Sequence, residues 1–166
     1  MKLTTKGRYA VTAMTDLAAY GGEGPVALSE IAVRQAISLS YLEQLFGKLR
    51  RAGLVASVRG VGGGYVLNRP ASAVRVSDIV AAVDEEIRTT ACAPGSKDGC
   101  AGGGSPRCLT HDLWDELGRQ IELFLSAATL DDVLERRVLG MAAVNAPSRA
   151  RDYAAEPAPE TAEAGA

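Results

Sequence analysis

The chain has 166 residues, of which 47% are hydrophobic and 5% aromatic, with 18 Lys and Arg against 20 Asp and Glu. This apolar content can build one compact core or two small ones. No run approaches the roughly 18 uninterrupted apolar residues of a membrane span, and polar and basic residues interrupt the amino terminus where a signal sequence would be apolar. We therefore expect a cytoplasmic protein.

The near-neutral total hides a division of charge along the chain. Residues 1–69 carry nine Lys and Arg against four Asp and Glu, a net charge of +5, whereas residues 70–166 carry nine against sixteen, a net charge of −7. An even scatter of charge would leave both parts near neutral. The first part is therefore the candidate for binding a polyanion.

The basic part opens with two helical patterns. Apolar residues recur at helical spacing over Ala10–Ala18, which predicts an amphipathic helix that ends at Gly21–Gly22. A second, short helix is predicted over Leu28–Ala32, with Ser29 as its N-cap. A brief turn is expected at Ala36–Ile37.

A third helix is predicted from near Ser40, where Ser40 and Glu43 match a capping box, to Gly53, which suits a helix end. Helical projection separates an apolar face from a polar and basic one. The apolar face contains Leu42, Leu45, Phe46 and Leu49. The polar face contains Ser40, Gln44, Lys48 and Arg51, and Tyr41 and Glu43 flank it. A short helix, a tight turn and such a helix place side chains in the major groove of DNA. An ordinary solvated helix would show the same pattern when taken alone.

A predicted hairpin favours the DNA-reading interpretation. Leu54–Val58 and Tyr65–Leu67 are strand-like, and the loop between them, Arg59–Gly64, is rich in glycines that tolerate positive φ. Helix, helix-turn-helix and hairpin in this order predict a winged helix-turn-helix, a fold that is mainly α with a small β-hairpin wing. The alternative, a phosphate-binding loop, lacks a third motif glycine and a Walker Lys-Ser/Thr, and it leads into a strand.

A short structural helix follows, predicted over residues 76–83 with Ile79 and Val80 facing inward. Beyond it, the only three cysteines and the only histidine of the chain lie within one twenty-residue, Gly-rich stretch. Sulfur and imidazole ligands suit zinc or an iron-sulfur cluster, and the wide spacing without a Cys-x-x-Cys knuckle favours a cluster over zinc. A disulfide with a stray thiol is the structural alternative, which an odd cysteine count in a cytoplasmic protein disfavours.

A long amphipathic helix is predicted directly after the histidine. Its apolar stripe contains Leu113, Leu117, Ile121, Phe124 and Ala128, widened by Trp114 and Leu125. The stripe is wider than one small domain needs, which favours a dimer contact, although it could pack only against its own winged helix. The final residues, rich in Ala, Pro and Glu, predict a disordered tail.

Three segments together resemble a known family. The stretch from Ile37 to Leu67, the start LTTKGRYAVTAM and the motif CLTHDLW are similar to the iron-sulfur cluster regulators of the Rrf-type family of winged-helix transcription factors, over about residues 1–134. The resemblance implies a homodimeric regulator, mainly a repressor, that controls genes of iron-sulfur cluster assembly. It also implies one two-iron, two-sulfur (2Fe-2S) cluster per subunit, with the cluster assembly machinery as donor.

Carried over by position, the implied cluster ligands are Cys92, Cys100, Cys108 and His111. The loops between successive cysteines are longer here than the usual family pattern. Flexible insertions cost little closure entropy, so ligation stays plausible.

Specific roles on DNA follow from side-chain chemistry. Gln44 suits adenine, Glu43 can accept a hydrogen bond from cytosine and would serve discrimination, and Arg59 suits a narrow minor groove. The predicted DNA-binding residues are Ser40, Tyr41, Glu43, Gln44, Lys48, Arg51 and Arg59, of which Lys48 and Arg51 would meet mainly phosphate.

The predicted organisation is a winged helix-turn-helix domain over residues 1–70, a cluster loop with dimerisation helices over residues 71–140, and the tail over residues 141–166. Two other functions stay open. An electron-transfer or redox enzyme would need a catalytic constellation, and the only histidine is already assigned to the metal. A zinc-stabilised DNA-binding protein without a sensing role would use the same ligands.

Overall fold

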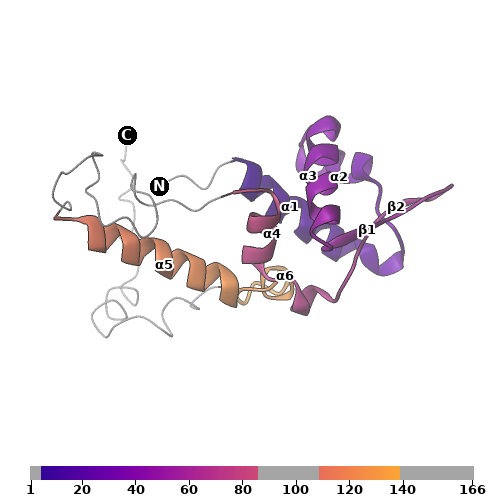
Figure 1. The fold of residues 1–166 in the computed structure, drawn as a ribbon. Coiled ribbons are helices and arrows are strands. Elements are labelled where there is room, and N and C mark those ends of the chain that lie inside the picture. The colour runs from indigo at the N-terminus through magenta and orange to yellow at the C-terminus, as the bar shows by residue number, and fades with distance from the viewer. Residues whose placement is uncertain (1–4, 86–108, 139–166) are drawn as a thin grey trace, which may run out of the picture.

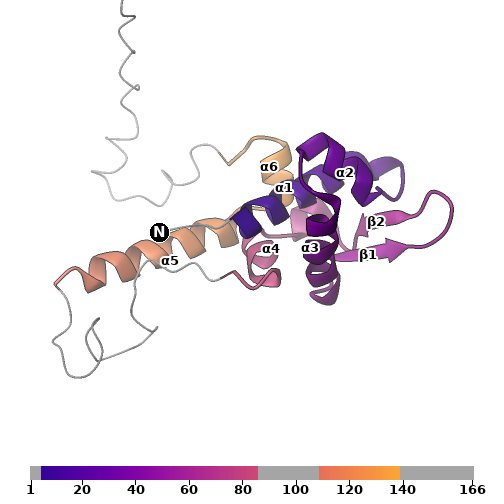
Figure 2. The ribbon, with the colours of Figure 1, turned by 90° about the horizontal axis from the view of Figure 1, so that it is seen from above.

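The structure, a computed structural model, describes residues 5–85 and 109–138. The described part contains six α-helices and one hairpin (Figure 1): α1 (Thr5–Tyr20), α2 (Leu28–Gln35), α3 (Leu39–Arg51), β1 (Val55–Val58), β2 (Gly64–Leu67), α4 (Val76–Ala82), α5 (His111–Ala127) and α6 (Leu130–Leu134). Two short 3-10 helices, Gly21–Glu23 and Ala71–Ala73, lie between them. Helices α1–α4 and α6 form a compact body. The hairpin extends from one end of this body and α5 from the other, as Figures 1 and 2 both show. Among the described helices, none has the length and apolarity that a membrane crossing requires.

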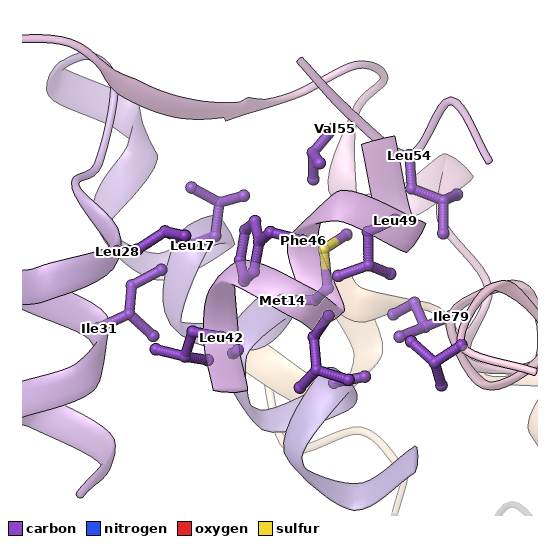
Figure 3. Close-up of a cluster of buried hydrophobic side chains, with 14 of the residues drawn as sticks. Met14, Leu17, Leu28, Ile31, Leu42, Phe46, Leu49, Leu54, Val55 and Ile79 are labelled. Carbon is purple, nitrogen blue, oxygen red and sulfur yellow. The ribbon is translucent and has the colours of Figure 1, made fainter. Parts of the chain in front are cut away.

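One apolar core holds the body together. Phe46 from α3 and Met14 and Leu17 from α1 are completely buried at its centre (Figure 3), as is Ile79 from α4. Full burial of such side chains contributes about 1.5–3 kcal/mol each. Leu130 at the start of α6 lies in the same core, so α4 and α6 pack with the first three helices. The predicted division at residue 70 stays a prediction.

The helix-turn-helix is present where the sequence predicted it, although both predicted N-caps are wrong. Helix α2 begins one residue before Ser29, with Ala27 as its N-cap, and α3 begins at Leu39, one residue before Ser40. The Leu42 N–H already donates to the Ser38 carbonyl over 3.1 Å, which closes the first turn of α3 and leaves Ser40 inside the helix. No side chain caps either helix.

The turn between α2 and α3 depends on a left-handed residue. Ala36 has φ 52° and ψ 41°, and its N–H donates to the Ala32 carbonyl. The Ile37 N–H donates to the same carbonyl over 3.1 Å, so the chain reverses within one turn. Helix α3 ends at Arg51, and Gly53, the glycine predicted to close it, follows the C-cap Ala52 with φ 72°.

The wing is an antiparallel pair in which Val55 lies opposite Leu67 and Val58 opposite Gly64. A third segment joins it: Val26 and Tyr65 exchange two backbone hydrogen bonds, of 3.0 and 2.8 Å. In the loop, Gly60 and Gly62 have φ of 109° and 75°. The glycine run is therefore the wing loop, as the hairpin interpretation expected.

Backbone contacts join the carboxyl end of α5 to the body. The Val76 N–H donates to the Ala128 carbonyl and the Leu130 N–H to the Val74 carbonyl, each over 2.9 Å. Thr129 then caps α6 through a capping box with Asp132. Sequence reasoning did not predict α6, because a helix of five residues shows no periodicity. The predicted tail, residues 141–166, lies outside the described residues.

Candidate nucleic-acid interface and metal ligands

Helix α3 presents the polar face that its periodicity predicts. The inward residues Leu42, Phe46 and Leu49 have no exposed surface, and this fixes the rotation of the helix about its axis. The opposite face is open to solvent at Ser40, Glu43, Gln44 and Arg51, while Tyr41 and Lys48 are partly exposed. Burial of one stripe therefore orients six of the seven predicted DNA-binding side chains.

Two aromatic contacts hold α3 against its neighbours. The Phe46 ring meets the Tyr65 ring edge-on, with centroids 4.9 Å apart, which fixes α3 relative to β2. Tyr41 meets Tyr9 of α1 in the same manner at 6.0 Å. Arg59, the seventh predicted contact, is exposed in the wing loop beside Val61, which is fully exposed. The helix and the wing are thus set in one fixed arrangement.

A partly buried ionic cluster positions α2, and sequence reasoning missed it. The Asp16 side chain is completely buried in α1 and accepts hydrogen bonds from Arg34 Nη2 at 2.7 Å and from Gln35 Nε2 at 2.7 Å. The hydrogen bond to Asp16 raises the pKa of Arg34. The Arg34 guanidinium also lies over the Tyr20 ring, 4.2 Å from its centroid. Charged hydrogen bonds of this kind fix the end of α2, and hence the turn into α3.

The two predicted phosphate contacts of α3 have intramolecular partners. Lys48 Nζ lies 2.6 Å from Asp84 Oδ2, beyond the end of α4. Arg51 Nε donates to the Gly47 carbonyl of its own helix over 3.2 Å. The contact with Asp84 could not be foreseen, because 36 positions separate the two residues.

Of the four predicted cluster ligands, the structure describes only His111. It is the first residue of α5 and is 8% exposed, whereas the next three residues are all exposed. Cys92, Cys100 and Cys108 lie outside the described residues. Within the described ranges, no three His, Cys, Asp or Glu side chains are grouped so that they could hold a metal ion. A buried imidazole at a helix start, three positions after a cysteine, fits the donor set that a cluster requires.

The predicted apolar stripe of α5 divides into two parts. At the carboxyl end, Ala128 is 2% exposed and packs with Val76 and Val80 of α4, as Leu125 also does. Nearer the amino end, Leu113 and Trp114 are 62% and 44% exposed. Leu117, Ile121 and Phe124 are partly exposed. Among the described residues, α4 therefore packs against the carboxyl end of the stripe, and exposure is largest at its amino end.

Comparisons with known proteins agree with this geometry. The family model Rrf2, described as an iron-dependent transcriptional regulator, matches residues 3–136. The HTH-type transcriptional regulator IscR of Yersinia pseudotuberculosis is 54% identical over 137 residues, which are 82% of this chain and 81% of the relative. IscR of Xenorhabdus nematophila is 53% identical over the same share.

Two solved structures show a similar fold. IscR of T. potens has a TM-score of 0.66 and 40% identity, over 82% of this chain and 88% of that one. CymR, the global cysteine regulator of B. subtilis, has a TM-score of 0.68 and 35% identity, over 82% of this chain and 98% of that one. The winged-helix prediction and the predicted family are thereby confirmed.

Proposed function

The chain belongs to the Rrf2 family of transcriptional regulators, and we propose that it reads specific DNA as a homodimer under the control of a 2Fe-2S cluster. The family assignment carries the regulatory and DNA-binding part of this function. The cluster, the dimer and the individual contacts are proposals that rest on the residues described above.

On DNA, α3 would lie in the major groove with Gln44 toward adenine and Ser40 and Tyr41 toward bases or phosphates. Arg51 would meet phosphate and Arg59 the minor groove. Their exposure supports these roles. Recovering bound fragments from a random duplex library identifies the sequence that is read. A half-site spacing of about one helical turn would support the dimer.

Glu43 would discriminate among sequences, because an exposed carboxylate next to phosphate is repelled unless it accepts a hydrogen bond from cytosine N4. The Glu43→Ala variant should bind non-cognate duplexes more tightly and its cognate duplex equally or better. Glu122→Ala on α5 makes the same charge change and should leave the ratio of affinities unaltered. Equal weakening of Glu43→Ala on every duplex would contradict this role.

A second copy of the chain would cover the amino-terminal part of the α5 stripe. The partly exposed Leu117 belongs to this stripe, whereas Leu123, 56% exposed, lies on the opposite side of the helix by its spacing. Sedimentation should therefore find Leu117→Glu monomeric and Leu123→Glu still dimeric. A dimer that survives Leu117→Glu would refute the use of this stripe.

The cluster would be held by Cys92, Cys100, Cys108 and His111, and when bound it supplies an iron centre whose potential a nitrogen ligand raises. The protein binds it through thiolates and a neutral imidazole, so uptake depends on pH. Because His111 opens α5, ligation would fix the first turn of the helix that carries the proposed dimer stripe. The carboxyl end of the same helix is joined to α4, so the effect can reach the reading head, which consists of α2, α3 and the wing.

Anaerobically purified protein tests this ligand set through visible absorption and through its iron and acid-labile sulfide content. Replacing any one cysteine with Ala should abolish the absorption. His111→Cys should keep it with a lower reduction potential, because four thiolates donate more charge. Colourless protein that contains zinc would instead support the zinc-stabilised regulator.

The regulated genes would include those of cluster assembly, and the assembly machinery would donate the cluster. Genome-wide DNA occupancy of the natural protein can be compared with that of a variant in which Cys92, Cys100 and Cys108 are Ala. Identical occupancy of the two proteins would refute control by the cluster.

A further inference from the structure

Lys48 is held by a carboxylate from another part of the fold. Its ammonium lies 2.6 Å from Asp84 Oδ2, and its side chain is 29% exposed. A second ammonium lies nearby, because Lys6 Nζ donates to the Asp84 backbone carbonyl over 3.4 Å. The next residue is also anchored, since the Gly7 N–H donates to Glu85 Oε2 over 2.9 Å. Two lysines therefore converge on Asp84.

The charged side chains of this cluster shift one another's pKa values. The hydrogen bond to Asp84 raises the pKa of Lys48, and the same bond lowers the pKa of Asp84. Partial burial, and then the neighbouring Lys48, lower the pKa of Lys6. Two adjacent ammonium groups repel each other and attract any anion that reaches both. In the free protein the Asp84 carboxylate is bound to Lys48, while Lys6 donates to the backbone carbonyl of the same residue.

The Asp84 carboxylate is also easily displaced. Its side chain is 76% exposed, and exposed ion pairs exchange partners at little cost. Lys48 lies one helical turn after Gln44, on the side of α3 that the proposed function places against DNA. A phosphate oxygen offers Lys48 the same charge-assisted hydrogen bond that Asp84 offers.

We propose that Asp84 is an internal substitute for a DNA phosphate at Lys48, so that DNA binding exchanges one anion for the other and Asp84 limits both affinity and salt dependence. This inference rests on the proposed placement of α3 on DNA. Asp84 would thereby affect DNA binding without being one of the proposed DNA contacts. Occupation of Lys48 by Asp84 would weaken binding to any sequence, and so leave recognition to the groups that contact bases.

The backbone at Asp84 suggests a clean substitution. Asp84 has φ 53°, in the left-handed region, which Asn tolerates about as well as Asp. Asp84→Asn therefore removes the negative charge and keeps the left-handed backbone conformation. Asp84→Gly also removes the charge, and glycine adopts this conformation without strain. Asp115→Asn is the matched control, because Asp115 is an ion-paired aspartate on α5, 3.6 Å from Arg119.

The experiment measures affinity for a selected duplex across a series of salt concentrations. Freeing one lysine for phosphate should steepen the slope of log K against log salt by about 0.9 per bound subunit, and tighten binding several-fold at 0.1 M salt. Asp84→Asn and Asp84→Gly should both show this change, and Asp115→Asn should not. In the Lys48→Gln background, Asp84→Asn should have no further effect on the slope.

Three results would overturn the inference. Unchanged or weaker binding by both folded Asp84 variants would make the ion pair purely structural. A steeper slope that persists in the Lys48→Gln background would make Asp84 a source of general repulsion. Failure of the natural protein to select any duplex would instead refute the proposed function, and this inference with it.

Discussion

Gly64, at the start of β2, should not tolerate a side chain. A Cβ at this position would lie 2.4 Å from the Val26 carbonyl oxygen, 2.5 Å from the Val26 carbonyl carbon and 2.9 Å from the Ala27 nitrogen. All three are backbone atoms, which cannot rotate away as the end of a side chain can. They are also held close, because Val26 and Tyr65 share two hydrogen bonds, of 3.0 and 2.8 Å. Gly64→Ala must therefore separate β2 from the segment before α2, or compress both.

The cost follows from these two ways of relaxing. Separation loses two backbone hydrogen bonds, worth about 1 kcal/mol each. Compression costs about 1–3 kcal/mol as overpacking. Alanine returns about 0.4–1 kcal/mol by restricting the unfolded chain. Separation therefore leaves a net loss of about 1–1.6 kcal/mol in the free energy of unfolding, and compression leaves a net loss of at most about 2.6 kcal/mol.

Gly47 provides the matched control within the same protein. It lies inside α3, where an added Cβ would have no atom within 4 Å. Alanine stabilises a helix interior by about 1 kcal/mol relative to glycine. Urea unfolding without DNA should therefore find Gly47→Ala more stable and Gly64→Ala less stable than the natural protein. A neutral or stabilised Gly64→Ala would refute the close approach between Val26 and β2.

Three further changes test other parts of the fold. Phe46→Ala should lower the free energy of unfolding by about 3–5 kcal/mol in urea, because the side chain is fully buried. Ala36→Gly should raise the free energy of unfolding by up to about 1 kcal/mol in the same assay. Ala36 has φ 52°, a conformation that is strained for a residue with a side chain and unstrained for glycine. The hydrogen bond from the Thr129 hydroxyl lowers the pKa of Asp132 in the folded protein. The ionised carboxylate therefore stabilises the fold fully when the pH is above its ordinary pKa near 4. This stabilisation is lost as the pH falls through the lower pKa of the folded state. Acid titration of stability should accordingly be flatter in Asp132→Asn, and an unchanged acid limb would contradict the capping box.

The sequence was sufficient to predict the reading head because its signals are periodic. Burial of Leu42, Phe46 and Leu49 follows from their spacing, and the wing follows from two short apolar runs joined by glycines. The capping predictions at Ser29 and Ser40 were each wrong by two residues, because the N-caps are Ala27 and Ser38. A hydroxyl caps a helix only if the first turn begins there, and the backbone closes that turn earlier in both helices.

Contacts between distant residues could not be predicted in the same way. Asp16 and Arg34 are 18 positions apart, and Lys48 and Asp84 are 36. No periodicity links such pairs, and each arises only after helices with apolar faces have packed. Lys48 was predicted to contact phosphate because the sequence indicates an exposed lysine on the polar face of α3. The sequence does not indicate that the fold places the Asp84 carboxylate beside it. The three cysteines were predicted as ligands from the chemistry of the Cys/His cluster and from the family resemblance, and they stay a prediction.

The positions of Asp84 and His111 suggest how the two proposals are connected. Cys92 follows Asp84 by eight positions and Cys108 precedes His111 by three, so the proposed ligands lie between an anchor on the reading helix and the start of α5. Binding of all four side chains to one cluster would restrict the segment between these two anchors, and the restriction would be relieved most easily at the weaker anchor. The exposed pair of Lys48 and Asp84 is such an anchor. Occupancy of the cluster site and affinity for DNA would then be coupled through the contact of Lys48 with Asp84, which a DNA phosphate can replace. Asp84→Asn should therefore reduce the difference in DNA affinity between the natural protein and the variant in which the three cysteines are Ala.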